Sequence, residues 1–216
     1  ANELKIYDYY TLKSKDTHFR DIWLSTLEPF GIQEASSKYD IFIEEKTENL
    51  AQEFLNKYKG KFLIGINLEG AVKGKKISYE ELKKICVGLF HISKKIQIFI
   101  NYMPRQISQT KQAVSKMNLD YVKLSYKTNS FLDAAALLKN LDLVITPDTS
   151  IAHVASAFNI PVITIHEDNY ESYKLFSPTS DLNRTAFSKK NNSLEGFSIK
   201  ILLDLAEELI TLINKT

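Results

Sequence analysis

The residues best suited to chemistry lie in a short polar turn, 147–150, which follows an apolar stretch and precedes a run of small residues. The pattern predicts a buried strand that enters a helix directly. Such a turn presents free backbone N–H groups and the positive end of a helix dipole, and both favour a diphosphate. Thr149 and Ser150 add hydroxyl donors, and Asp148 can accept hydrogen bonds from sugar hydroxyls. An equally good interpretation is that Asp148 or Thr149 simply caps the helix.

His153 falls in the first turn of the same predicted helix. A lone histidine is more often a packed, hydrogen-bonded residue than a catalyst. Its place beside the expected phosphate position favours a phosphate or structural contact, and we do not assign it as a general base.

A second candidate is the glycine-punctuated loop after the apolar stretch 62–67, which carries Lys73, Lys75 and Lys76. A flexible loop of this kind can wrap phosphates with ammonium groups. Taken alone, it is more simply an exposed basic loop that aids solubility. Two such loops at the carboxyl ends of strands in one sheet favour phosphate binding more strongly than either loop does alone.

Two further features give weaker signals. Tyr102 and Arg105 follow the apolar stretch 95–100, a position suited to contacts with a base or ribose. The acidic segment 166–170 offers carboxylates that can bind a metal, but an ordinary solvated loop is the better interpretation. The four histidines show no metal-ligand spacing. We therefore expect no metal site, and we expect no cofactor either.

The composition of the chain argues against several classes of protein. The 216 residues include 28 basic and 26 acidic side chains, and a net charge of +2 gives no electrostatic footprint for nucleic acid. Cys86 is the only cysteine, which excludes an intramolecular disulfide. No apolar run reaches the length of a membrane helix, and the first residues lack the regions of a signal peptide. We expect a cytoplasmic protein whose contact with a membrane, if any, is peripheral.

The elements that must position these residues alternate along the chain from Lys61. Strands followed by helices predict parallel crossovers, and hence a Rossmann-like α/β fold: a parallel sheet with helices on both faces. The expected strands are 62–67, 95–100, 121–124, 141–146 and 161–165, and the expected helices are 79–90, 107–117, 130–139, 151–158 and 199–213.

Residues 1–60 differ from the rest of the chain. Apolar residues between Phe19 and Phe30 recur at helical spacing, and Gly31 then ends the pattern as a C-terminal cap. A short extended stretch at 39–43 and a charged helix at 47–58 follow. This region cannot form a large core by itself. We interpret residues 1–60 as a connector, the tail of a further N-terminal domain, and residues 61–216 as the main domain.

The segment 141–165 resembles the signature of glycosyltransferase family 9, which includes the lipopolysaccharide heptosyltransferases that use ADP-heptose. That signature is similar to Asp-(Thr/Ser)-Gly-x-x-His-x-Ala-x-Ala, followed by an apolar residue, a proline and a strand. The matching residues here are Asp148, Thr149, His153, Ala155, Ala157 and Pro161. Lys75 falls where the phosphate-binding lysine of the family lies.

The resemblance implies the C-terminal domain of a GT-B glycosyltransferase, which binds ADP-heptose or a related nucleotide sugar. The sugar would pass to the lipopolysaccharide core at the cytoplasmic face of the inner membrane. By this analogy Asp148 contacts the donor sugar, while Thr149, Ser150 and Lys75 hold the diphosphate. No metal is implied, because fixed cations and helix dipoles offset the charge of the leaving group.

Three departures from the family pattern matter. Ser150 replaces the usual glycine, and the loop after residue 100 carries Tyr102 and Arg105 in place of a glycine and an acidic nucleoside contact. Such enzymes also exceed 300 residues as a rule and carry the acceptor site and the catalytic base in an N-terminal domain. A general base must reach the acceptor hydroxyl, and we can name none here. We expect that this chain cannot transfer sugar efficiently alone.

Three other functions fit the same residues. Ser150 and the shortness of the chain favour a non-catalytic module that binds nucleotide sugars. A GT-B enzyme with another donor, such as a UDP-sugar, or an epimerase-like enzyme is the second. A Rossmann-like interaction domain without a ligand is the third.

Overall fold

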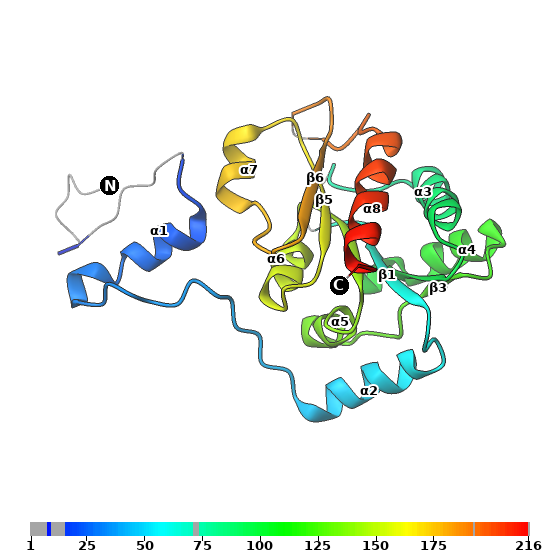
Figure 1. Cartoon of the computed structure of the whole chain (residues 1–216), viewed down its shortest axis with the longest axis horizontal. Helices are drawn as coiled ribbons and strands as arrows, with labels where there is room; N and C mark the ends of the chain where they lie inside the picture. Colours follow the sequence, from blue (N-terminus) through cyan, green and yellow to red (C-terminus); the bar gives the residue numbers. More distant parts are fainter. Residues whose placement is uncertain (1–7, 10–15, 71–73, 192, 216) are drawn as a thin grey trace. The chain divides into compact units, whose positions relative to one another are not determined.

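The computed structural model describes residues 8–9, 16–70, 74–191 and 193–215, and Figure 1 shows how its helices and strands are arranged along the chain. The chain divides into two compact units. The smaller unit comprises Ala1–Tyr39 and Asn169–Ser177, and the larger one comprises Asp40–Asp168 and Pro178–Thr216.

The larger unit is built on one six-stranded sheet in which every strand pair is parallel. The strand order β3-β2-β1-β4-β5-β6 places β1 and β4 side by side at the centre. Both strands consist mostly of consecutive apolar residues, as is typical of strands that are covered by helices on both faces. The predicted Rossmann-like fold is therefore confirmed. The strands are β1 (Phe62–Asn67), β2 (Ile96–Asn101), β3 (Val122–Leu124), β4 (Leu143–Pro147), β5 (Val162–His166) and β6 (Asn183–Phe187).

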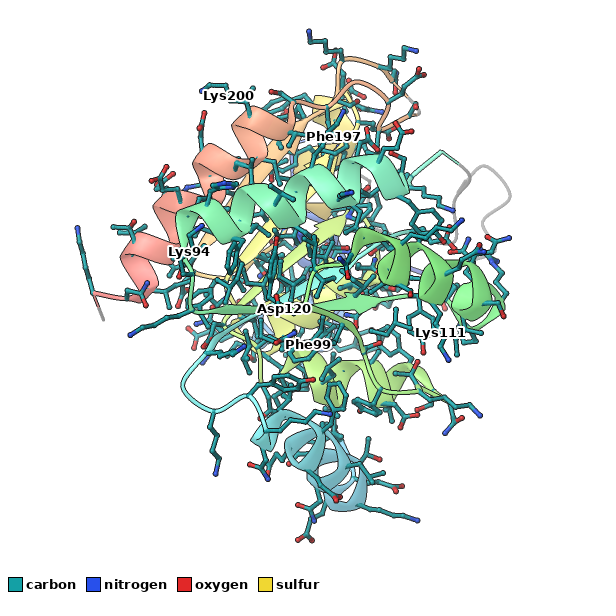
Figure 2. The ribbon with its side chains drawn as sticks, turned by 90° about the vertical axis from the view of Figure 1, so that its right-hand side faces the viewer. Lys94, Phe99, Lys111, Asp120, Phe197 and Lys200 are labelled. Carbon is teal, nitrogen blue, oxygen red and sulfur yellow. The ribbon has the colours of Figure 1, made fainter. Side chains whose placement is uncertain are left out.

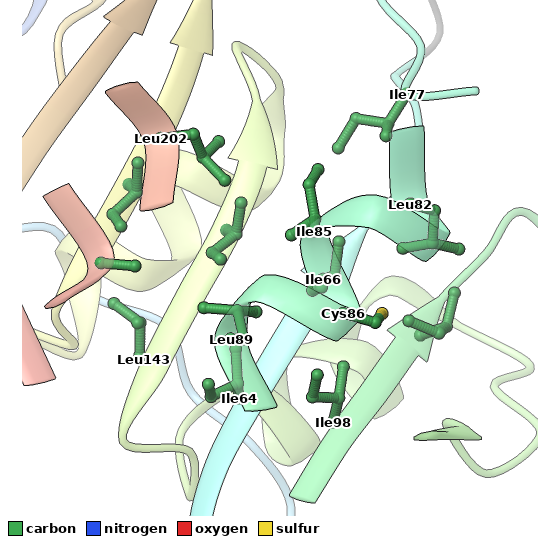
Figure 3. Packing of buried hydrophobic residues seen from close by; sticks show 14 of the residues in the cluster. Ile64, Ile66, Ile77, Leu82, Ile85, Cys86, Leu89, Ile98, Leu143 and Leu202 are labelled. Atoms are coloured by element: carbon green, nitrogen blue, oxygen red, sulfur yellow. The ribbon is translucent and has the colours of Figure 1, made fainter. Parts of the chain in front are cut away.

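One face of the sheet is covered by α3 (Tyr79–Ile92), α4 (Ile107–Met117) and α8 (Ile199–Ile213). Leu82, Ile85 and Leu89 of α3 pack on Ile64 and Ile66 of β1, as Figure 3 shows. The spacing of these leucines and isoleucines is that of one helical face, and the two isoleucines alternate on one face of the strand. Among the described residues, no helix is long and apolar enough to cross a membrane.

The opposite face is covered by α2 (Glu45–Asn56), α5 (Phe131–Leu138) and α6 (Ser150–Ala157). Here Phe99 of β2 packs against Phe54 and Tyr58, with ring centroids 5.4 and 5.1 Å apart. Figure 2 shows Phe99 in the interior, whereas Lys111 and Lys200 lie on the outer surface.

Helix α2 therefore belongs to the sheet-bearing unit. The sequence interpretation began the main domain at Lys61, but the contacts place residues 40–60 in the same compact unit as the sheet. The physical reason is that Phe54 in α2 and Tyr58, just after α2, pack against Phe99 of the sheet. Periodicity along a helix does not indicate which surface the helix packs against.

The smaller unit contains α1 (Phe19–Ser25), the 3₁₀ helix η1 (Glu28–Phe30) and α7 (Tyr170–Phe176). Gly31 ends η1 with a φ of 78°, in the left-handed region that glycine adopts at no steric cost. The imidazole of His18 lies 3.0 Å from the carbonyl oxygen of Ser177, which joins the two chain segments of this unit.

Two elements of the structure were not expected from the sequence, α7 and β6. Residues 39–43, expected as a short extended stretch, pair with no strand among the described residues. Strand β6 lies at an edge of the sheet, where only one neighbour is present. Its sequence, Asn-Arg-Thr-Ala-Phe, lacks the apolar run that reveals the central strands.

Candidate functional site

A cavity of about 350 Å³ lies at the carboxyl edge of the sheet, where loops from β1, β2, β3 and β4 meet. The chain runs from β1 outward to β2 and β3, but from β4 outward to β5 and β6, so the β1/β4 boundary is the topological switch point. Open α/β sheets bind their ligands at this place. The lining includes Asn67, Glu69, Gly70, Asn101, Tyr102, Ser130, Phe131, Thr149 and Ser150.

Two helices begin at this cavity, and their first backbone N–H groups face it with positive dipole ends. Ser130 caps α5 in a reciprocal capping box with Asp133. Thr149 caps α6, and its hydroxyl oxygen accepts from the N–H of Ile151 at 3.3 Å. The capping interpretation of Thr149 is therefore confirmed, whereas Asp148 is not the cap. The cap residue itself also lines the cavity.

The loops after β1 and β4 approach each other closely beside Thr149. The Asn67 amide nitrogen donates to the hydroxyls of Thr149 at 3.3 Å and Thr146 at 3.1 Å, and to the carbonyl oxygen of Glu69 at 3.1 Å. A Cβ atom on Gly70 would lie 2.6 Å from the Thr149 methyl group. Gly70 thus permits this approach, which fixes one wall of the cavity.

One residue before the cap, a charged cluster gathers on Asp148. The ammonium of Lys75 donates to Asp148 Oδ2 at 2.5 Å, and His166 Nε2 lies 3.3 Å from the same oxygen. Glu167 Oε1 lies 3.9 Å from the Lys75 ammonium. The four residues come from the ends of β4 and β5 and from the loop after β1, so the sheet order brings them together.

The environment of Asp148 keeps its carboxyl group ionised. Burial alone would raise the pKa, but hydrogen bonds from His166 and Lys75 outweigh it and lower the pKa to about 2. The side chains of Asp148 and Lys75 are only 12% and 14% exposed. The pair is therefore a largely desolvated arrangement at the entrance to α6, unlike a solvated surface ion pair.

One expectation is corrected here. Lys75 donates to Asp148, and two residues later the Ile77 N–H donates to the Leu68 carbonyl at 2.8 Å. The order of the strands places Asp148 within reach of Lys75. His166 and Glu167, interpreted as part of a solvated loop, are buried at the end of β5. Among the described residues, no group of three or more histidine, cysteine, aspartate or glutamate side chains could hold a metal ion.

The other predicted site residues do not all line the cavity. Ser150 and Tyr102 both line the cavity, and burial raises the pKa of the Tyr102 phenol. His153 lies on α6, but the described residues that line the cavity do not include it. Lys73 lies outside the described residues. Arg105 contacts Glu69, 3.3 Å from Nη2 to Oε1.

The sequence interpretation missed the polar residues that end the first two strands. Asn67 and Asn101 are in-register partners in β1 and β2, and both line the cavity. Each is the polar residue that closes an apolar strand, which is the signal that could have found them. Glu69 is also buried in the lining.

The fold and the switch-point cavity define a Rossmann-like α/β domain of the kind found in GT-B glycosyltransferases. Residues 20–200 match the family model described as glycosyltransferase family 9 (heptosyltransferase). The chain belongs to glycosyltransferase family 9, which confirms the resemblance seen in segment 141–165.

Known proteins show the same relationship. A protein of Escherichia coli (strain K12), provisionally named lipopolysaccharide heptosyltransferase 4, is 24% identical over 153 residues, which cover 69% of this chain and 40% of that protein. A family 9 glycosyltransferase from Veillonella parvula is 19% identical with a TM-score of 0.80, over 97% of this chain and 64% of that one.

A third relative is the E. coli heptosyltransferase WaaC. Its structure with ADP is 18% identical to this chain with a TM-score of 0.67, over 94% of this chain and 60% of that one. A further structure of WaaC contains ADP-2-deoxy-2-fluoro heptose, with a TM-score of 0.60 at 18% identity, over 84% of this chain and 52% of that one. The chain thus spans 40% of the curated relative and 52–64% of these solved chains.

Proposed function

We propose that this chain binds the nucleotide-sugar donor of a glycosyltransferase, and that the switch-point cavity and the Asp148 cluster form the binding site. The observation that carries the proposal is the coincidence of three features at one sheet edge. The cavity receives two helix N-termini, lies at the switch point and adjoins the largely desolvated Lys75–Asp148 pair.

These features suit the chemistry of sugar transfer from a diphosphate. Negative charge grows on the diphosphate as the sugar departs, and fixed donors and cations stabilise it in the transition state. The N-terminus of α6 and the ammonium of Lys75 can supply that stabilisation without a metal. A carboxylate has about four acceptor sites. Asp148 can therefore accept from sugar hydroxyls while it still holds Lys75.

The proposed donor is ADP-heptose and the proposed acceptor is the lipopolysaccharide core. Two findings support the donor: the family model is described as heptosyltransferase, and WaaC has been solved with ADP and with an ADP-heptose analogue. The acceptor is taken from the name of the E. coli K12 relative. We assign the acceptor site and the general base to the part of the relatives that this chain does not span.

Isothermal titration calorimetry with ADP, ADP-heptose, UDP and UDP-GlcNAc tests the proposal. We expect the two adenine nucleotides to bind more tightly than the uridine ones. Lys75→Met should weaken ADP binding by about tenfold or more, because a charge-assisted contact to phosphate is lost. Lys75→Arg should retain part of the affinity, since it keeps the positive charge.

Lys200→Met is the matched control, because Lys200 is an exposed lysine on α8 that pairs with Asp204, four residues away on the same helix. It should leave ADP binding unchanged. If none of the four ligands binds to the folded wild type, the proposal is wrong. Tighter binding of UDP or UDP-GlcNAc would retain the donor-binding role but overturn ADP-heptose. ADP binding that survives Lys75→Met unchanged would place the diphosphate elsewhere.

A further inference from the structure

His166 is a buried histidine at the end of β5, and the proposed function gives it no task. The residue is 1% exposed, and its imidazole lies against the carboxylate of Asp148, with Nε2 3.3 Å from Oδ2. Packing alone does not account for a polar ring at this position, because the ring reaches the carboxylate that is proposed to contact the donor sugar.

The sheet fixes the backbone on both sides of this contact. Strands β4 and β5 pair in parallel register up to Pro147 and Ile165, so Asp148 comes level with His166 on the neighbouring strand. The Asp148 N–H donates to the Ile165 carbonyl at 3.0 Å, and the Ser188 N–H donates to the His166 carbonyl at 2.7 Å. The imidazole is therefore presented by a strand that is hydrogen-bonded to a neighbour on each side.

The ring of His166 is also held at a second point. Nδ1 lies 3.0 Å from the carbonyl oxygen of Glu167, and the ring centroid lies 6.0 Å from that of Phe187. Rotation of the imidazole would lose the contact of Nδ1 and move Nε2 away from Asp148. A side chain whose own position is locked in this way can hold another functional group in place.

The contacts of Asp148 engage only one of its two carboxylate oxygens. Lys75 Nζ lies 2.5 Å from Oδ2, and His166 Nε2 approaches the same oxygen. In the part of the chain that the structure describes, no group donates a hydrogen bond to Oδ1. A carboxylate offers about four acceptor sites, two on each oxygen, so Oδ1 keeps its capacity for a ligand hydroxyl.

Lys75 by itself cannot fix this arrangement once a donor is bound. Its ammonium is proposed to contact the diphosphate, and its flexible stem lets three donors turn among several acceptors. Glu167 Oε1 already provides a second acceptor, 3.9 Å away. When a diphosphate attracts the same ammonium, His166 still contacts Oδ2 of Asp148, because the strand sets the position of the ring.

We infer that His166 is a positioning residue, which holds Oδ2 of Asp148 so that Oδ1 remains directed at a hydroxyl group of the donor sugar. The inference rests on the proposed donor-binding function and adds a residue that acts on sugar recognition through Asp148. Loss of His166 should weaken binding of the nucleotide sugar more than binding of the nucleotide alone, since ADP lacks the transferred sugar.

Calorimetry with ADP and ADP-heptose on His166→Phe tests this inference in the full chain. Phenylalanine keeps an aromatic ring but removes the polar nitrogens. We expect the affinity for ADP-heptose to fall about threefold to tenfold more than the affinity for ADP, because the released carboxylate must be ordered again when the sugar binds. His91→Phe makes the same substitution at an exposed position of α3 and should change neither affinity.

Two amide variants distinguish positioning from packing. Glutamine places its amide nitrogen near the position of Nε2, whereas the shorter asparagine reaches only as far as Nδ1. His166→Gln should therefore keep the ratio of the two affinities within about twofold of the wild type, and His166→Asn should lower it as His166→Phe does. A role in packing alone would change the stability of the chain without changing this ratio.

A double-mutant cycle shows whether His166 acts through Asp148. In the Asp148→Ala background the carboxylate is absent, so His166→Phe should change the ratio of the two affinities no further. A further fall of the same size would mean that His166 affects the sugar by another route, and it would overturn the positioning role.

The outcomes separate this inference from the proposed function. If folded His166→Phe weakens ADP and ADP-heptose equally, the positioning role is wrong while donor binding stands. If His166→Phe does not fold, the glutamine and asparagine variants decide, and an equal ratio in both would overturn the role. If the wild type binds neither nucleotide, the donor-binding function itself fails.

Discussion

At the scale of single residues, Asp148 combines two tasks that a solvated aspartate could not. It holds Lys75 at 2.5 Å beside the N-terminus of α6, and it remains ionised although its side chain is only 12% exposed. Each task depends on the other, because Lys75 offsets the desolvation cost of the carboxylate. The pair thus places a cation next to the proposed diphosphate position before any ligand binds.

The acid sensitivity of this pair can be measured. The folded-state pKa of Asp148 is about 2, below its ordinary value of 3.8. Because the folded pKa is depressed, the stability that this group contributes is present above pH 4 and is lost as the pH falls towards 2. Its full contribution is on the order of 2 kcal/mol.

Urea unfolding of the wild type and Asp148→Asn from pH 7 to pH 2 measures this contribution. The difference in the free energy of unfolding should be constant above pH 5 and shrink by about 2 kcal/mol on acidification. Asp204→Asn removes an exposed ion pair on α8 and should show no such change. A difference between wild type and Asp148→Asn that does not vary with pH would contradict the argument.

At the scale of elements, the start of α6 depends on the loop after β1. Thr149 caps the helix with its hydroxyl, while its methyl group leaves no room for a side chain on Gly70. Helix capping and cavity shape are therefore set by one contact between two loops. This contact places the α6 N-terminus beside the cavity.

A double-mutant cycle tests that contact. Gly70→Ala should destabilise the chain by about 1–3 kcal/mol, because the new Cβ would lie 2.6 Å from the Thr149 methyl carbon. Thr149→Ser keeps the capping hydroxyl and removes the methyl group. The cost of Gly70→Ala should therefore be smaller in the Thr149→Ser background, as measured by urea denaturation. Additive effects would show that the two loops are not in contact.

At the scale of the whole molecule, the sheet-bearing unit extends beyond the part with alternating strands and helices. Leu55 of α2 is 7% exposed and belongs to the same core cluster as Phe99. The cover over this face of the sheet is thus assembled from α2, α5 and α6. Loss of α2 packing should weaken the unit that carries the candidate site.

Two leucines on α2 provide a matched test. Leu55→Ala should lower the free energy of unfolding by about 2–5 kcal/mol, because it leaves a cavity in a packed core. Leu50 is 51% exposed on the same helix, and Leu50→Ala should cost less than about 0.5 kcal/mol. Chemical denaturation of the full chain measures both. Equal small effects would show that α2 does not pack on the sheet.

Much of the fold could be predicted because the central strands and their helices carry strong periodic signals. The predicted helices 107–117 and 199–213 have the bounds observed for α4 and α8. The signal fails for β6 and α7, which are short and lack a continuous apolar face. It also fails to show that α2 packs on the sheet, since an amphipathic helix does not specify what covers it.

The sequence by itself determined the α/β architecture, the family and the turn 147–150, because these depend on local periodicity and on residue types at fixed spacing. Only the tertiary structure decided that Asp148 meets Lys75, 73 positions earlier, and that Glu69 and Asn101 line one cavity. The order of the strands in the sheet determines which of these residues lie next to one another. Because β1 lies between β2 and β4, residues far apart in the chain share one sheet edge, and no pattern along a single segment encodes that neighbourhood.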